Sequence, residues 1–239
     1  MISVALALAG LVVLAGALIQ GAAGFGMNLI AAPLLALADP RLVPVPLLLI
    51  AGAHAVLSMA REWHDIDWPG VRWAMLGRLP GTILGVVAVA TLAPRPFAAI
   101  VGASVLICGL LSVTSWRPTP TPGPLLLAGV ASGTFGTAAS IGGPPLALLY
   151  QHSSGRQIRA TLAACFGIGT VISLTGLGIG GQIQTNHLVL GLALLPFLVV
   201  GFALSGPARR ILDAGRTRAA VITIAMVSAL VLLVRSLLG

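Results

Sequence analysis

Long apolar runs with very few charged residues dominate this chain. Hydrophobic residues make up 58% of its 239 residues, and charged residues make up only 8%. Several of the runs reach or approach the ~20 residues that a helix needs to cross a bilayer. This composition predicts an all-α polytopic membrane protein.

Charged residues and prolines divide the chain into about eight candidate transmembrane spans. They lie near residues 3–37, 43–60, 72–92, 97–115, 124–150, 160–180, 188–206 and 218–238. The first and fifth are too long or too rich in glycine to be simple helices, so we expect broken helices there. The start of the chain has no positively charged segment and no clear cleavage site, and we interpret it as a retained first span rather than a signal peptide.

The net charge of +8 comes from thirteen arginines, with no lysine, against five acidic residues. These arginines lie mostly in short connections rather than in one patch, so nucleic acid is not an expected partner. The connections after odd-numbered spans hold more arginine than those after even-numbered spans, and the positive-inside rule places the odd connections in the cytoplasm. Both chain termini and the tryptophan-rich loop over residues 61–73 are therefore expected on the outer, periplasmic side.

A pattern of glycine, small polar residues and proline occurs twice, 112 residues apart. It reads "GAAGFGMNLIAAP" over residues 21–33 and "GTFGTAASIGGPP" over residues 133–145. Between the two copies, "RPTPTPGP" alternates proline with threonine and glycine, and we expect an extended linker there. The pattern predicts an N-terminal transmembrane repeat over 1–116, a linker over 117–124 and a C-terminal repeat over 125–239.

The number of spans in each half decides how the two halves are related. Four spans are an even number, so the halves should share one orientation and be related by an axis along the membrane normal. If one candidate span is a hairpin or an interfacial segment, the parity changes and the repeat is inverted. The sequence leaves both arrangements open.

The repeated stretch suggests a binding site built largely from backbone. In hydrocarbon, irregular backbone is tolerated only where protein buries it or where it lines a watery cavity. A broken helix exposes N–H groups at the start of its second half, where the helix dipole favours an anion. Two such ends near the midplane would bind a small anion through Gly24, Gly26, Asn28, Thr137, Ser140, Gly142 and Gly143. The alternative is that these glycines only allow close helix packing.

Two ionisable residues within the spans are further candidates. Arg78 could bind the anion in an outer vestibule, because a guanidinium offers a fork of donors to a sulfonate or carboxylate. It could equally extend its charge to the lipid headgroups. His54 lies well inside the second span and could carry a coupled proton or bind the anion. The alternative for His54 is a neutral imidazole bonded to a neighbouring helix.

Other polar residues give weaker signals. Glu62, His64, Asp65 and Asp67 lie close together in one loop, but their spacing matches no defined set of metal ligands. We expect a solvated polar loop and no metal site there. The two cysteines, Cys108 and Cys165, lie in separate apolar runs and are expected to be small packing residues. Arg156 and Arg159 are explained by the orientation of the chain.

Four stretches together resemble the sulfite exporters of the TauE/SafE type: "GFGMNLIAAPLLAL", "IDWPGVRWAMLGRLPGTILG", "SIGGPPLALLY" and "GRQIRATLA". Each is short and dominated by glycine, and their order and spacing over nearly the whole chain support the resemblance. The resemblance implies secondary transport of small anions, often sulfite or organosulfur compounds, across the bacterial inner membrane. The chain departs from the family pattern at Met27 and Asn28, which replace part of a glycine run, so we expect substrate choice to be determined there.

These observations predict a secondary transporter, and more specifically an exporter, of a small oxyanion such as sulfite or an organosulfonate. The expected partners are the anion and membrane lipids, with a coupled proton as a hypothesis, and no cofactor is expected. An enzyme would need a nucleophile with a base or a set of metal ligands, and the spans offer neither pattern. An anion channel or a non-transporting membrane assembly factor remains the alternative, because glycine-rich packing serves those proteins too.

Overall fold

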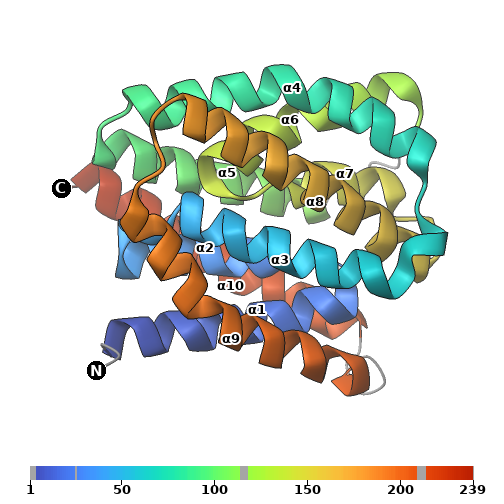
Figure 1. Cartoon of the computed structure of the whole chain (residues 1–239), viewed down its shortest axis with the longest axis horizontal. Helices are drawn as coiled ribbons and strands as arrows, with labels where there is room; N and C mark the ends of the chain where they lie inside the picture. The colour runs from blue at the N-terminus through green and yellow to red at the C-terminus, as the bar shows by residue number, and fades with distance from the viewer. Residues whose placement is uncertain (1–3, 25, 114–117, 209–213, 239) are drawn as a thin grey trace.

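The computed structural model describes residues 4–24, 26–113, 118–208 and 214–238, and within them it contains ten α-helices, two short 3-10 turns and no strand (Figure 1). The helices are α1 (Val4–Ala23), α2 (Met27–Ala38), α3 (Val45–Glu62), α4 (Trp68–Thr91), α5 (Pro94–Val113), α6 (Pro122–Ala139), α7 (Gly143–Tyr150), α8 (Gly155–Ile179), α9 (Thr185–Ala208) and α10 (Ala214–Leu238). The turns are η1 (Pro40–Leu42) and η2 (Trp63–Asp65). The all-α prediction is confirmed.

Lengths and surface composition agree with a membrane protein. Within the described residues, five helices are long and apolar enough to cross a bilayer, namely α1, α3, α4, α8 and α9. Large apolar side chains such as Ile83, Leu127 and Ile179 are exposed on the outside of the bundle. Lipid can cover such side chains at no cost, whereas in water they would form aggregation-prone patches.

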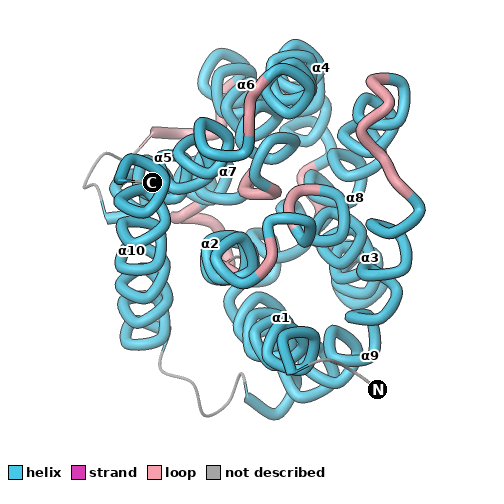
Figure 2. Tube along the Cα trace, turned by 90° about the vertical axis from the view of Figure 1, so that its left-hand side faces the viewer, coloured by secondary structure: helices cyan, strands magenta, loops and turns pink. Residues whose placement is uncertain are grey.

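Each of the two longest candidate spans is divided into two helices. The break between α1 and α2 falls within residues 3–37, and the break between α6 and α7 falls within residues 124–150. The short helices α2 and α7 lie beside α1 and α6, so each pair forms a hairpin (Figure 2). The prediction of broken, glycine-rich helices is confirmed, and the eight candidate spans correspond to ten helices in the described part of the chain.

Helix ends gather at two opposite ends of the bundle. At one, which we call the ion-pair end, Arg159 pairs with Glu62 at 2.7 Å and the Tyr150 hydroxyl donates to Asp67 at 2.7 Å. These contacts bring the ends of α3 and α7 to the starts of α4 and α8. At the other, which we call the terminal end, a surface pocket is lined by the ends of α2, α4 and α8 and the starts of α3, α5 and α9. The chain also starts α1 and finishes α10 at the terminal end (Figure 1).

The first five helices are repeated by the last five with reversed direction. α3 runs toward the ion-pair end while its counterpart α8 runs away from it, and α4 and α9 are likewise opposed. The packing follows this relation, since α4 packs on α6 as α9 packs on α1, and α5 packs on α10. The two sets are therefore inverted. The expectation of parallel repeats is wrong because each hairpin adds one reversal of the chain per half.

The same topology corrects the assignment of loops to sides. The loop over residues 61–73 was expected on the opposite side from Arg159, but the Arg159–Glu62 ion pair joins them at one end. The hairpin at residues 124–150 shifts every later connection to the other side, which accounts for the error.

The proline-rich segment proves to be partly helical. α6 begins at Pro122, so the last residues of the expected linker over 117–124 form the first turn of that helix. Proline is tolerated there because the first N–H groups of a helix have no intrahelical acceptor. Residues 114–117 lie outside the described part, and the repeat boundaries at 1–116 and 125–239 stay a prediction.

Close packing explains part of the glycine pattern. Gly77 and Gly81 on α4 face Gly129 and Gly133 on α6, and a methyl group on any of the four would collide with backbone of the opposite helix. Small residues at a spacing of four allow such close approach of helices in membranes. In the first copy of the pattern, Gly21 faces α9 in the same way. The first glycine of each copy therefore serves helix packing, as the alternative interpretation held.

Candidate functional site

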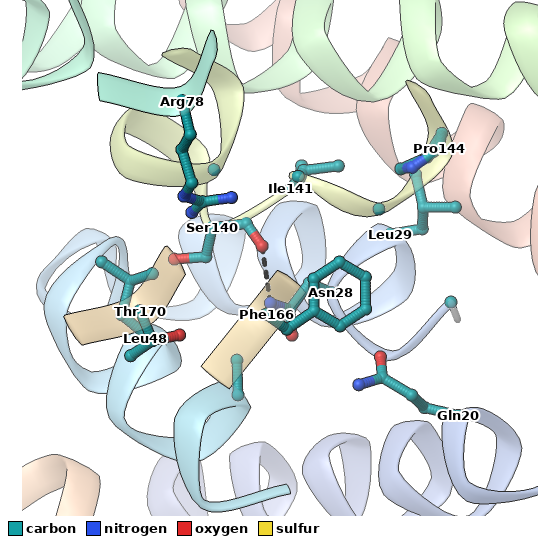
Figure 3. A pocket seen from close by; sticks show the side chains of 15 residues that line it. Gln20, Asn28, Leu29, Leu48, Arg78, Ser140, Ile141, Pro144, Phe166 and Thr170 are labelled. Carbon is teal, nitrogen blue, oxygen red and sulfur yellow. Dashed lines mark hydrogen bonds between the residues drawn. The ribbon is translucent and has the colours of Figure 1, made fainter. Parts of the chain in front are cut away.

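A cavity of about 40 Å³ lies in the middle of the bundle between the two helix breaks (Figure 3). Six of the residues predicted from the sequence line it together: Gly26, Asn28, Arg78, Ser140, Gly142 and Gly143. They come from α4 and from the two breaks, which the sequence separates by more than a hundred residues. The structure therefore brings both copies of the repeated pattern to one cavity.

Three other predicted residues lie outside this lining. Thr137 is fully buried in α6, and its hydroxyl hydrogen-bonds that of Ser173 at 2.8 Å. Gly24 and His54 line a second, smaller cavity nearby. These residues surround the central cavity without lining it.

The breaks need backbone conformations that most residues avoid. Gly24 and Gly26 have φ angles of 93° and 116°, which glycine adopts without steric cost. Ser140 has a φ of 62°, a left-handed conformation that is uncommon for a residue with a side chain. The Ser140 hydroxyl donates to the Pro44 carbonyl at 3.0 Å, and this bond holds the second break against the start of α3.

The breaks are displaced from each other by one helical turn relative to the sequence repeat. α2 and α7 end at Ala38 and Tyr150, 112 residues apart, but α1 and α6 end at Ala23 and Ala139, 116 residues apart. The second copy thus continues its first helix for one more turn before it breaks. As a result, Gly136, the sequence counterpart of Gly24, lies within α6 and not in a break.

The two halves are hydrogen-bonded to each other at the cavity. The Asn28 amide nitrogen donates to the Ser140 carbonyl at 2.5 Å across a separation of 112 residues. Asn28 lies in the first turn of α2, and Gly143 begins α7. The starts of both short helices therefore face one cavity, and each contributes the partial positive charge of a helix N-terminus.

Arg78 supplies a full positive charge to the same cavity. It lies near the middle of α4 and is only 3% exposed. One terminal nitrogen donates to Ser132 at 2.8 Å and the other to Ser173 at 3.2 Å, while Nε has no partner. Within the described residues, ion pairs to carboxylates involve only Arg41 and Arg159, so no carboxylate neutralises Arg78. The expected outer vestibule and the extension to headgroups are both wrong, because the side chain is enclosed at mid-span.

A buried cation without a counter-ion is costly to maintain. The penalty for removing an ion from water amounts to several kcal/mol, and neutral hydroxyl partners offset only part of it. A protein retains such a charge where a ligand of opposite sign occupies the site for part of its cycle. The arrangement can therefore bind an anion.

Glycines make room for the Arg78 guanidinium. A methyl group built on Gly136 would lie 2.8 Å from one terminal nitrogen, and one on Gly169 would overlap the guanidinium carbon and Nε. Gly136 belongs to α6 and Gly169 to α8, so two helices shape this space. The second copy of the glycine pattern thus serves packing and the site at once.

Gly169→Ala is expected to lower transport by roughly tenfold to a hundredfold, because a displacement of about 1 Å at a binding group has effects of that size. The added methyl group would push the guanidinium from its position. The matched control is Gly167→Ala on the same helix, where the methyl group would meet only the flexible Met59 side chain, 3.3 Å from its sulfur. Initial rates in proteoliposomes measure the difference, and equal rates for the two variants would contradict it.

A second cavity of about 10 Å³ connects the site with the ion-pair end. It shares Gln20 and Phe166 with the central cavity and is also lined by Ser58 and by both members of the Glu62–Arg159 pair. Polar side chains therefore continue from the central cavity to the ion pair. That ion pair joins α3 of one half to α8 of the other.

His54 lies along this polar path with its hydrogen-bonding capacity in use. Its Nε2 contacts the Ala17 carbonyl at 3.2 Å, and its Nδ1 contacts the Gln20 amide nitrogen at 3.2 Å and the Ser58 hydroxyl at 3.3 Å. A neutral imidazole with its proton on Nε2 satisfies all three contacts. This geometry is the one expected for an imidazole bonded to a neighbouring helix, and it places His54 one residue away from the central cavity.

Sequence reasoning missed several polar residues of the site. Gln20, Ser132, Ser173 and Thr170 line the cavity or bond to Arg78. A signal existed for two of them, because Gln20 and Ser132 are also 112 residues apart and immediately precede the two copies of the pattern. Polar residues in register beside a repeated break could have been added to the candidates.

The polar loop at the ion-pair end has structural bonds. Asp67 accepts from the Gly70 N–H at 3.2 Å as the cap of α4, and the Thr161 hydroxyl accepts from the Asp67 N–H at 3.0 Å. Together with the Glu62–Arg159 pair, these bonds correct the expectation that the carboxylates are simply solvated. Among the residues that the structure describes, no group of three His, Cys, Asp or Glu side chains could hold a metal ion.

Comparisons with known proteins point to one family. The family model described as "Sulfite exporter TauE/SafE" matches residues 8–232. The match includes both helix breaks, Arg78 and the ion pair. No curated protein and no solved structure matches the chain.

Proposed function

The chain belongs to the sulfite exporter TauE/SafE family, and from this premise we propose that it is a secondary transporter that exports sulfite or an organosulfonate across the bacterial inner membrane. Family membership implies a multi-pass membrane transporter of sulfite- or sulfonate-type anions. Direction, coupling and the particular anion are the further content of the proposal.

One observation supports the proposal most strongly. The Arg78 guanidinium lies in a cavity between the starts of α2 and α7, with no carboxylate partner among the described residues. A guanidinium and two helix N-termini together favour an oxyanion, because each offers N–H donors as well as positive charge. The proposed substrate-binding residues are Gly26, Asn28, Arg78, Ser140, Gly142 and Gly143, with Gly24 and Thr137 as supporting neighbours.

The distribution of arginines supports an orientation in the membrane. The ion-pair end holds more of the described arginines than the terminal end: Arg61, Arg72, Arg156, Arg159, Arg216 and Arg218 against Arg41, Arg95 and Arg235. By the positive-inside rule, the ion-pair end is then cytoplasmic and both termini are periplasmic. This keeps the expected side of the termini and reverses that of the loop over residues 61–73.

Inverted repeats suggest how the anion would cross. In transporters of this architecture, one repeat moves against the other around a fixed midplane site. The Glu62–Arg159 pair links the two halves between the cavity and the ion-pair end. Breaking this pair would open the cavity to the cytoplasm, and forming it would close that side.

Transport by purified protein tests the proposal. Uptake of sulfite and of several sulfonates into proteoliposomes should saturate with concentration and should show counterflow. A channel would give neither saturation at low concentration nor counterflow, and an assembly factor would give no flux. Absence of saturable flux for every anion would overturn the proposed function.

His54→Gln tests proton coupling. Glutamine can still donate to the Ala17 carbonyl and accept from Gln20, but it cannot take up a proton near neutral pH. We expect the variant to lose accumulation driven by a pH gradient, by about tenfold or more, while sulfite counterflow without a gradient continues. Ser58→Ala, which removes a neighbouring hydroxyl, serves as the control. Accumulation at the wild-type level in His54→Gln would exclude this residue from coupling.

A further inference from the structure

Two buried polar atoms at the central cavity have no hydrogen-bond partner within the described part of the chain, and they are of opposite kinds. One is Arg78 Nε, a donor, and the other is Asn28 Oδ1, an acceptor. Both residues line the cavity. An atom pair of this kind specifies the ligand from two directions.

The orientation of the Asn28 amide is determined by its surroundings. Its nitrogen donates to the Ser140 carbonyl, which can only accept, so exchanging nitrogen and oxygen would place two acceptors against each other. The acceptor Oδ1 is therefore the atom left for a ligand. A ligand that satisfies both free atoms must present an acceptor to Arg78 and a donor to Asn28.

Fully deprotonated oxyanions fail this requirement. Sulfite dianion and organosulfonates present only acceptor oxygens, and an anionic oxygen beside Asn28 Oδ1 leaves that buried acceptor unsatisfied, at a cost of about 1–3 kcal/mol. A dianion would also leave one negative charge uncompensated by Arg78 in a site of low dielectric. A singly protonated oxyanion has one negative charge, several acceptors and one O–H donor.

The size of the cavity narrows the class further. A volume of about 40 Å³ accommodates roughly three water-sized groups, because each needs about 10–15 Å³. This suits a compact inorganic oxyanion with three oxygens. A sulfonate with a carbon chain would need a wider cavity than the structure provides.

We infer that the site selects hydrogen sulfite, or an inorganic monoanion of the same shape with one O–H group, over sulfite dianion and over sulfonates. This rests on the proposed transport of sulfite-type anions and specifies the form that is bound. Arg78 binds the charged oxygens, and Asn28 Oδ1 accepts the proton of the O–H group. Because the bound anion already contains a proton, each transport event moves one proton together with sulfite.

Other titratable groups near the cavity must be separated from this effect. Arg78 lies on α4, Cys165 is buried on α8, and His54 lies on α3 behind Gln20. The Glu62–Arg159 pair borders the adjacent smaller cavity. In the described parts of α1, α2 and α6, no ionisable side chain is present, and in α7 the sole one is Tyr150 at the ion-pair end. A probe anion that does not titrate near neutral pH reports how these groups act by themselves.

The test measures sulfite uptake by wild-type proteoliposomes with equal pH on both sides, in steps from pH 6 to pH 8. The KM in total sulfite should rise as the hydrogen sulfite fraction falls, by roughly tenfold per pH unit above the pKa of hydrogen sulfite. The KM expressed as hydrogen sulfite should stay constant. Methanesulfonate, a monoanion without an O–H group, should inhibit at least about tenfold more weakly than hydrogen sulfite and with little dependence on pH.

Asn28→Leu provides a second readout that does not need transport. Binding is measured by the rise in Tm of the purified protein with sulfite or methanesulfonate at pH 6. In the wild type and in the control Thr170→Val, which alters another residue of the cavity lining, hydrogen sulfite should bind more tightly than methanesulfonate. In Asn28→Leu, the ratio of the two affinities should fall toward one.

The outcomes separate this inference from the proposed function. If saturable sulfite flux has a KM in total sulfite that does not depend on pH, or if methanesulfonate competes equally well, selection of the protonated form is overturned and transport stands. If no anion gives saturable flux or a shift in Tm, both are overturned.

Discussion

Replacing Arg78 by glutamine is expected to lower sulfite transport by at least about 30-fold while the folded protein persists. The guanidinium is the one full positive charge among the described residues that line the cavity. Truncating one partner of a buried, hydrogen-bonded charge pair costs about 2–5 kcal/mol, and the lower bound corresponds to roughly 30-fold. Initial rates of uptake at low sulfite concentration measure the loss. Arg78→Lys should recover only part of it, because an ammonium lacks the planar fork of donors.

Stability distinguishes a binding role of Arg78 from a structural one. In the absence of anion, the buried guanidinium is only partly compensated by Ser132 and Ser173, so Arg78→Met should leave the Tm unchanged or raise it. Added sulfite should raise the Tm of the wild type and not that of Arg78→Met. Arg72→Gln is the matched control, since Arg72 is an exposed arginine on the same helix and should transport normally. A large fall in Tm for Arg78→Met, with transport retained in Arg78→Gln, would show that the arginine is structural.

The helical class and the broken helices could be predicted from the sequence because both follow from local chemistry. Apolar runs must become helices in lipid, and glycine with proline at residues 21–33 and 133–145 interrupts them. The direction of the chain after each break could not be predicted in the same way. Whether a helix continues or turns back at Gly24–Gly26 depends on packing against α3 and α9, which no local pattern records. That single decision determines the parity of the spans and the sides of all later loops.

The chemistry of the site was predictable to the extent that it depends on the repeat. Asn28 and Ser140 were matched by their spacing, and the structure joins them by a hydrogen bond. Arg78 was placed at the membrane surface because a charge in a span usually reaches the headgroups. Its burial depends on Gly136 and Gly169, which make room for it from two other helices. Space created by distant glycines is a tertiary property, and the sequence of α4 alone contains no sign of it.

Asn28→Leu and Ser140→Leu are each expected to reduce transport to the level of protein-free liposomes. Leucine at position 28 removes the bond that joins the two halves and leaves the Ser140 carbonyl without its donor, at a cost of about 1–3 kcal/mol. Leucine at position 140 must adopt a φ of 62°, which costs roughly 1–2 kcal/mol, and it loses the bond to the Pro44 carbonyl. Both changes also place an apolar side chain where the anion would bind.

The control for this pair is Ser140→Gly, which allows the left-handed backbone and keeps the carbonyl that accepts from Asn28. It should retain transport within about tenfold of the wild type, because it loses only the hydroxyl bond to Pro44. Size-exclusion profiles and Tm values of the purified variants establish that each protein is folded. Normal transport in both leucine variants would mean that the repeated stretch serves helix packing alone, as Gly21 and Gly133 do.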